Sequence, residues 1–304
     1  MDARIAIVVG NGLTIDLATR HGLWHPSKPL RFPFRMPGNL HWRDALPTLS
    51  ASLPQHLEGS FDSFEPFATL GAGQNPALDS EVRHFLTLAY SNFDHSVSEQ
   101  MLLHWPWRKW VRRHLRSIRA IISFNYETVF ERAFQLSSGI RLINAGVRHE
   151  GDHPRTPALF KPHGSIDLIH APSMVDIATG YPTTHHLTRN NLPILQCDRD
   201  RYLEPRVEGF AVLPGEASPY RDFQWVSPLY ENWQKFALSI THFVIAGMSY
   251  WECDRAEIDF LIKHLPPRTR IIIANPQPPL VLTSWLQEQG RDFECWTSDL
   301  ERVF

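Results

Sequence analysis

The chain has 304 residues, and its 30 Lys and Arg against 32 Asp and Glu give a formal net charge of −2. At about 150 residues per domain, this length allows one large domain or two ordinary ones. Apolar residues make up 43% of the chain, which excludes general disorder. The near-zero charge predicts no general attraction to nucleic acid or to an acidic membrane.

The three cysteines, Cys197, Cys253 and Cys295, lie far apart and form no C-x-x-C pair. This sparse, odd set argues against a disulfide framework and against a thiolate zinc site, so we expect no metal and a reducing compartment. The N-terminus has no cleavable signal pattern, and no apolar run approaches the roughly 18 residues that a membrane span needs. We therefore expect a cytoplasmic protein without membrane contact.

Strand and helix patterns alternate along the chain. Strands are predicted where apolar, often β-branched residues run continuously, and helices where apolar residues recur at i, i+3, i+4 and i+7. In chain order, the expected elements are a strand over 5–9, helices over 82–97 and 107–118, a strand over 120–124, a helix over 129–134, strands over 159–161 and 242–247, a helix over 258–265 and a strand over 270–274. The predicted class is α/β: a Rossmann-like open parallel sheet with helices on both faces.

Two stretches interrupt this rhythm. Residues 23–60 show no sustained period and are interpreted as an insertion over the sheet edge, and residues 147–227 are loop-rich, with short strand candidates at 193–195 and 210–213. We expect one domain over 1–304, with a core from residues 1–20, 119–170 and 228–304 and insertions at 21–118 and 171–227.

The first strand leads into Gly10-Asn11-Gly12-Leu13-Thr14-Ile15-Asp16. In an open parallel sheet, ligands bind outside the carboxyl ends of the strands, and glycines before a helix N-terminus suit a pyrophosphate. Because Ile15 stands where a third glycine belongs, an ordinary strand-to-helix turn is the alternative. Hydride transfer is disfavoured, because a dehydrogenase needs a strand ending in an acid near residues 29–34, and this segment contains Pro29 and Pro33 instead.

Polar groups also follow the later strands. These segments are Ser123-Phe124-Asn125-Tyr126-Glu127, Pro162-His163-Gly164-Ser165, Gly247-Met248-Ser249-Tyr250 and Asn275-Pro276. Each alone has a structural explanation: Asn125 as a helix N-cap, His163 as a core histidine, Asn275-Pro276 as a turn. Asp254 and Glu257 resemble acids in the first turn of a helix.

Taken in order, these motifs resemble those of the sirtuin family. Gly10–Thr14 is similar to its Gly-Ala-Gly-x-Ser loop, Ser123–Glu127 to its Thr-x-Asn-x-Asp motif, His163-Gly164 to its His-Gly pair, and Gly247-Met248-Ser249 to its Gly-x-Ser loop. Asn275-Pro276 resembles its late ribose contact. Asn11, Thr14 and Glu127 depart from the family residues Ala, Ser and Asp. The four zinc cysteines of deacylating sirtuins are missing, as in the bacterial zinc-lacking NAD-hydrolase branch associated with anti-phage defence.

The resemblance implies an NAD+ hydrolase that releases nicotinamide and ADP-ribose, with Asn125 and His163 as catalytic residues and His163 as the neutral base. The residues it implies for binding NAD are Gly10, Asn11, Gly12, Thr14, Asp16, Phe124, Tyr126, Glu127, Gly247, Ser249, Asn275 and Pro276. The defence setting also implies a partner protein, and the helical region over 82–118 is the expected contact surface of a homo-oligomer. The alternatives are an NAD-dependent protein deacylase or ADP-ribosyl transferase, and a non-catalytic sensor of NAD or ADP-ribose.

Residues 108–119 contain six Lys and Arg and no acid. A solvated face of a helix is the favoured interpretation, so direct binding of nucleic acid is not expected. Were it to occur, this segment is the candidate, and the affinity would fall steeply with salt.

Overall fold

A parallel sheet of six strands runs through the protein in the order β3-β2-β1-β6-β7-β8. The strands are β1 (Ile5–Val9), β2 (Ile118–Ser123), β3 (Ala158–Phe160), β6 (His242–Ala246), β7 (Arg270–Ala274) and β8 (Phe293–Trp296). This computed structural model describes residues 3–31, 39–53, 67, 70, 75–147, 156–170, 193–204, 206, 209–213 and 223–298. Numbered within the sheet, the order is 3-2-1-4-5-6, that of the Rossmann fold.

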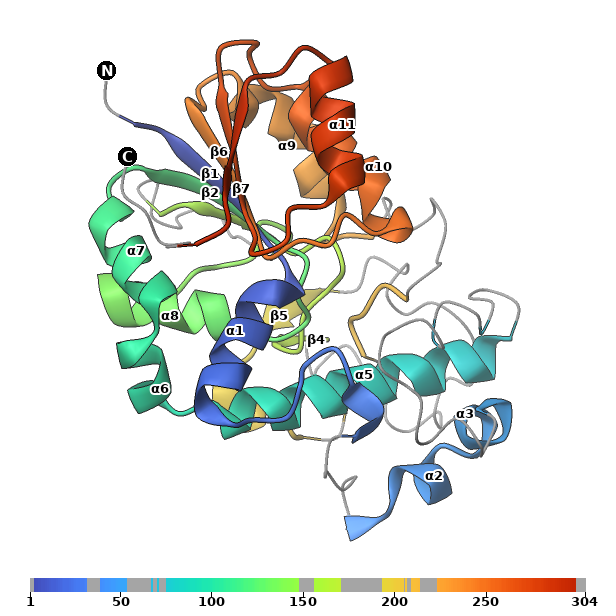
Figure 1. Cartoon of the computed structure of the whole chain (residues 1–304). Helices are drawn as coiled ribbons and strands as arrows, with labels where there is room; N and C mark the ends of the chain where they lie inside the picture. The colour runs from blue at the N-terminus through green and yellow to red at the C-terminus, as the bar shows by residue number, and fades with distance from the viewer. Residues whose placement is uncertain are drawn as a thin grey trace.

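Apart from the edge strand β8, the strands are largely buried on both faces, as a parallel sheet covered by helices requires. Ile5, Ile7 and Val9 point into one apolar core, whereas Ala6 and Val8 point into the other. The first core is closed by α1 (Asn11–His21), α5 (Pro76–Ser96), α6 (Glu99–His104), α7 (Pro106–His114) and α8 (Val129–Ser138). The second is closed by α9 (Ser227–Ala237), α10 (Glu252–Lys263) and α11 (Leu280–Glu288), which lie together in Figure 1. The predicted α/β class is confirmed.

Smaller elements extend this core. β4 (Leu168–His170) and β5 (Ile194–Gln196) form a separate antiparallel pair. α2 (Trp42–Ala45) and α3 (Pro47–Ser52) lie near one end of the long helix α5, far from the sheet in Figure 1. Two 3-10 turns, η1 (Pro29–Arg31) and η7 (Arg199–Arg201), complete the described elements. Among the described residues, no helix is both long and apolar enough to cross a bilayer.

The structure corrects two of the predicted elements. The helix expected over 107–118 ends at His114, so Ile118 and Arg119 belong to β2 and the cations of 108–119 do not share one helix. The candidate strand over 210–213 is reduced to a single bridge between Ala211 and Gly164. Its residues are buried by other contacts, and their apolar run therefore imitates a strand.

Candidate functional site

The candidate site lies where the strand order of the sheet reverses. β1 is flanked by β2 and β6, both parallel to it. The strands that follow β1 in the chain first extend the sheet on the β2 side and then, from β6 on, extend it on the other side. In open α/β sheets, ligands bind at this switch point, outside the carboxyl ends of the strands. Gly10 follows β1 there, Phe124 and Asn125 follow β2, and Gly247 follows β6.

The glycine loop after β1 packs directly on the loop after β6. The Gly10 N–H donates to the Ala246 carbonyl at 2.9 Å, and the Gly12 N–H donates to the Gly247 carbonyl at 2.8 Å. A Cβ on Gly10 would lie 2.2 Å from Met248 Sδ, and a Cβ on Gly12 would lie 2.7 Å from the Gly247 oxygen. This close approach alone requires both glycines. The N–H of Asn11, between the two glycines, donates to no backbone carbonyl of the described residues.

Asn125 connects the loop after β2 to that glycine loop. Its amide nitrogen donates to the Gly10 carbonyl at 3.3 Å and to Thr14 Oγ1 at 3.1 Å, and the side chain is buried. Its amide oxygen accepts no hydrogen bond from the described residues. Asn125 is not the helix cap, because α8 begins at Val129 and its N-cap residue is Thr128. The oxygen of a rigidly held amide is thus available at the switch point.

Glu127 is buried behind Asn125 and its carboxylate is used within the protein. One oxygen accepts from Thr14 Oγ1, and the other accepts from the Val129 N–H at 2.8 Å. Burial raises the Glu127 pKa to about 7, although the nearby Lys161 ammonium lowers it. The longer Glu side chain therefore braces α1 against the start of α8.

Lys161, directly before Pro162-His163, is also fully buried. Its ammonium donates to the Glu127 carbonyl at 2.6 Å and to Glu131 Oε1 at 2.9 Å. Burial lowers the Lys161 pKa, but the Glu131 and Glu127 carboxylates outweigh that effect and the pKa rises. Burial raises the pKa of Glu131. This buried ion pair attaches the segment before His163 to α8 and to the Asn125 loop.

His163 lies against the ring of Phe124, edge to face, with the ring centroids 4.9 Å apart. Its side chain is 18% exposed, and burial lowers its pKa, which Asp254 and the Phe124 carbonyl act to raise. Gly164 takes a φ of +90°, and a Cβ there would lie 2.1 Å from the Phe210 oxygen, so this turn requires glycine. A mainly neutral imidazole suits a base that accepts a proton near neutral pH.

The other predicted residues divide into two groups. Gly247 and Asn275 lie in the same cluster, since the Asn275 amide donates to the Met248 carbonyl at 2.8 Å. Tyr126 donates its hydroxyl to the Val212 carbonyl at 2.5 Å. Asp16 lies apart, its carboxylate bound to Arg20 and to Trp105 Nε1. Ser249 and Pro276 are exposed, and within the described part of the chain their side chains form no hydrogen bond to the cluster.

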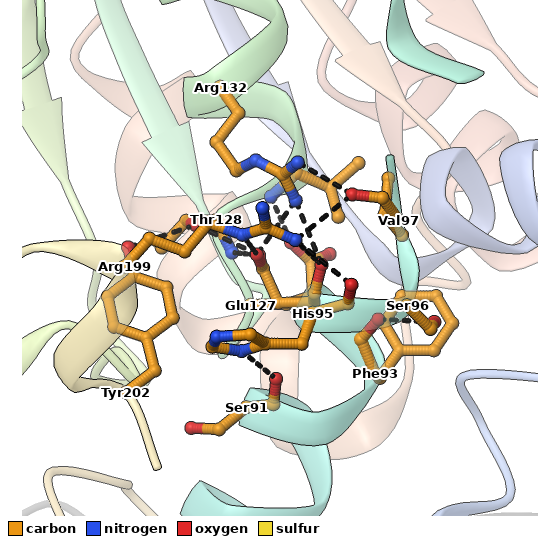
Figure 2. A network of polar contacts seen from close by, with 12 residues as sticks. Ser91, Phe93, His95, Ser96, Val97, Glu127, Thr128, Arg132, Arg199 and Tyr202 are labelled. Atoms are coloured by element: carbon orange, nitrogen blue, oxygen red, sulfur yellow. Dashed lines mark hydrogen bonds and ion pairs between the residues drawn. The ribbon is translucent and has the colours of Figure 1, made fainter. Parts of the chain in front are cut away.

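Two features escape the sequence prediction. Asp254, interpreted only as an acid of a helix start, does lie in the first turn of α10, but Oδ1 of its carboxylate is also 3.7 Å from His163 Nε2. Asp94 is a fully buried carboxylate that accepts from the Thr128 N–H, the Thr128 hydroxyl and Arg132, with Arg199 also paired to it. Figure 2 shows Thr128, Arg132 and Arg199 meeting beside Glu127. Neither contact has a local sequence signal.

No group of three or more potential metal ligands occurs among the described residues.

Comparisons with known proteins yield structural neighbours only. No protein-family model and no curated protein matches the chain. A mutant Sir2 homologue in complex with ADP-ribose has 12% identity and a TM-score of 0.42, covering 99% of this chain and 88% of its own. A Sir2 protein bound to a propionylated peptide has 11% identity and a TM-score of 0.42, covering 99% and 90%. Because these TM-scores are below 0.5, the fold assignment depends on the strand order described above and not on these neighbours.

Proposed function

We propose that this protein hydrolyses NAD+ at the bond between nicotinamide and ribose. The observation that carries the proposal is the junction at the switch point: Asn125 is hydrogen-bonded to Gly10 and Thr14, and the adjacent Phe124 packs against His163. An amide oxygen and a neutral imidazole thus flank the edge of the sheet where nucleotides bind in this topology. The resemblance of the motifs to those of NAD-consuming sirtuins names the nucleotide.

The proposed reaction consumes water and releases a proton. As the glycosidic bond breaks, the electron pair leaves with nicotinamide, which loses its positive charge, and the ribose acquires oxocarbenium character. His163 takes a proton from the attacking water, whose oxygen bonds to the anomeric carbon, and later returns that proton to solvent. Asn125 orients the ribose or the water through its amide oxygen. Groups that bind better in the transition state than in the ground state lower the barrier.

The buried contacts support this division of roles. Asn125 is hydrogen-bonded to Thr14, which is in turn hydrogen-bonded to Glu127. Lys161 connects the segment before His163 to α8 through Glu131. Groups held this firmly lose little entropy when the substrate arrives, which is what preorganised catalysis requires. We assign the pyrophosphate to the Gly10–Thr14 turn, where the Asn11 N–H is available.

The experiment is to incubate the purified protein with NAD+ and to quantify nicotinamide and ADP-ribose by chromatography. His163→Ala and Asn125→Ala are each expected to lower the rate about 10²- to 10⁴-fold, the usual effect of losing a general base or an equivalent group. His21→Ala, at the exposed end of α1, is the matched control and should retain the parental rate. Parental turnover in His163→Ala would refute the assignment.

Two added arms distinguish the alternatives. An acylated peptide that strongly accelerates nicotinamide release, with transfer of its acyl group, would identify a deacylase. No release combined with a higher melting temperature in NAD+ would identify a sensor.

We infer the biological setting, bacterial antiviral defence with a homo-oligomer or a partner protein, from the resemblance alone. Expression in a host challenged with phage tests it. NAD+ should fall in infected cells that carry the parental chain and remain steady in those that carry His163→Ala.

A further inference from the structure

The helix after β6 places an acid beside the proposed base. Asp254 Oδ1 is 3.7 Å from His163 Nε2, and the two side chains are only 14% and 18% exposed. The two residues are 91 positions apart in the sequence. They meet because His163 follows β3 and Asp254 follows β6, and the carboxyl ends of these parallel strands lie at the same edge of the sheet. Two partly buried ionisable groups at this distance interact strongly, because little water lies around them to screen their charges.

Of the groups described around the His163 imidazole, the Asp254 carboxylate is the charged one. From the β2 side the imidazole meets the aromatic ring of Phe124, at an interplanar angle of 77°, and the Phe124 backbone carbonyl, neither of which carries a charge. Among the described residues, Asp254 of α10 is the ionisable side chain that acts on His163. The Asp254 carboxylate accepts from the Cys253 thiol at 3.4 Å and has no Lys or Arg partner among the described residues, which leaves His163 as its basic neighbour.

We propose that Asp254 is a positioning residue for His163, orienting its imidazole and stabilising the imidazolium that forms when the ring accepts a proton. This rests on the proposed function, because it takes His163 to be the base. In this arrangement the proton from water stays on His163 until it passes to solvent, and none is transferred to Asp254. The arrangement needs no contact between Asp254 and NAD+.

A purely structural role for Asp254 has a matched control on the same helix. Asp254 lies in the first turn of α10, where an acid stabilises the helix through the helix dipole. Glu252 lies in that turn too, is exposed, and does not act on His163. Glu252→Gln therefore removes an acid from the same turn without touching the imidazole, whereas Asp254→Asn removes the carboxylate beside it.

The test is an NMR pH titration of the full chain with isotope-labelled histidine, in which the His163 signal is assigned as the one that His163→Ala loses. We expect Asp254→Asn to titrate His163 at a lower pH than the parent does, and Glu252→Gln to leave that titration unchanged. Asp254→Ser, which also keeps a polar side chain in the helix turn, serves if Asp254→Asn does not fold. An unchanged or higher His163 pKa in the variant without the acid overturns the proposal.

Kinetics provide the second readout. Asp254→Asn is expected to lower kcat for NAD+ cleavage by about 10- to 100-fold with a small change in KM, the usual cost of losing a residue that orients a reacting one. Asp254→Glu should restore part of that loss. Because the titration needs no turnover, an inactive parent protein would refute the proposed function and still leave the Asp254–His163 contact decided by NMR.

Discussion

Glu127 is an acid whose side chain is buried and whose pKa lies at about 7 rather than 4.5. A raised carboxyl pKa means that the folded state holds the proton more tightly than the unfolded state does. The stabilisation is thus fully present below about pH 4.5 and is lost as the pH rises through about 7. Between pH 5 and pH 8, the parent should lose about 2.5 kcal/mol of unfolding free energy relative to Glu127→Gln, which cannot ionise. Urea unfolding of both at each pH measures this.

The matched control for that prediction is Glu99→Gln, in the exposed first turn of α6. Its stability should differ from the parent's by the same amount at both pH values. A gap between the parent and Glu127→Gln that stays constant from pH 5 to pH 8 would show that the Glu127 carboxylate is not the buried, proton-binding group described above.

The protonation of His163 determines how the reaction rate is expected to fall at acidic pH. Burial lowers its pKa below the ordinary 6.5, so the imidazole is neutral and able to accept a proton at pH 7. The kcat/KM for NAD+ should therefore be level at pH 7 and should fall only as the pH drops below 6.5. A pH profile from 5 to 8 tests this, and an activity that rises as the pH falls would contradict a neutral imidazole base.

At the scale of elements, the contact between the loops after β1 and β6 shapes the switch point. The three atoms nearest to a Cβ on Gly12 are backbone atoms of Gly247, at 2.7, 2.8 and 3.0 Å, and backbone cannot rotate away as a side chain can. Gly12→Ala is expected to push the two loops apart and to destabilise the protein by about 1–3 kcal/mol, the usual cost of overpacking. NAD+ cleavage should fall with it.

Gly22→Ala is the control for that variant. No atom of the described residues lies within 4 Å of a Cβ at Gly22, so the substitution adds the strain of its left-handed backbone, about 1–2 kcal/mol. Thermal unfolding and turnover are compared for both variants. If Gly12→Ala retains parental activity, the close approach of these loops is not needed for the site.

At the scale of the whole molecule, Asp94 joins parts of the chain that are far apart in sequence. It lies in α5 and pairs with Arg132 of α8 at 2.8 Å and with Arg199 of η7 at 3.4 Å. The two arginines are labelled in Figure 2. Asp94→Asn would leave two arginines without their counterion, and losing one partner of a buried ion pair costs about 3–5 kcal/mol. Denaturant unfolding should show this loss, whereas Glu204→Gln, which breaks an exposed pair with Arg201, should change stability little.

The sheet is largely predictable from the sequence, and the exceptions have a physical cause. The strands β1, β6 and β7 are continuous apolar runs because both their faces are buried. β8 is not predicted, since it lies at the sheet edge, is only partly buried and contains Glu294 and Cys295. Helix α7 ends four residues before the predicted boundary because the apolar Ile118 enters β2 and not the helix.

The candidate site is predictable where it depends on strand ends and not where it depends on distant contacts. Asn125 and His163 follow predicted strands, and topology alone brings them to one edge of the sheet. The role of Asp254 beside His163 and the Lys161–Glu131 pair arise from the way helices pack on the sheet. No periodicity or motif in the sequence encodes those contacts, because each depends on residues at least 30 positions apart.

The central claim is that His163 drives cleavage of NAD+ by water. The most direct test is the release of nicotinamide and ADP-ribose from NAD+ by the purified parental chain, measured beside His163→Ala with no peptide present. The account predicts the two products in equal amounts from the parent and a rate about 10²- to 10⁴-fold lower from the variant. Equal rates from both proteins, or nicotinamide release that requires an acylated peptide, would contradict it.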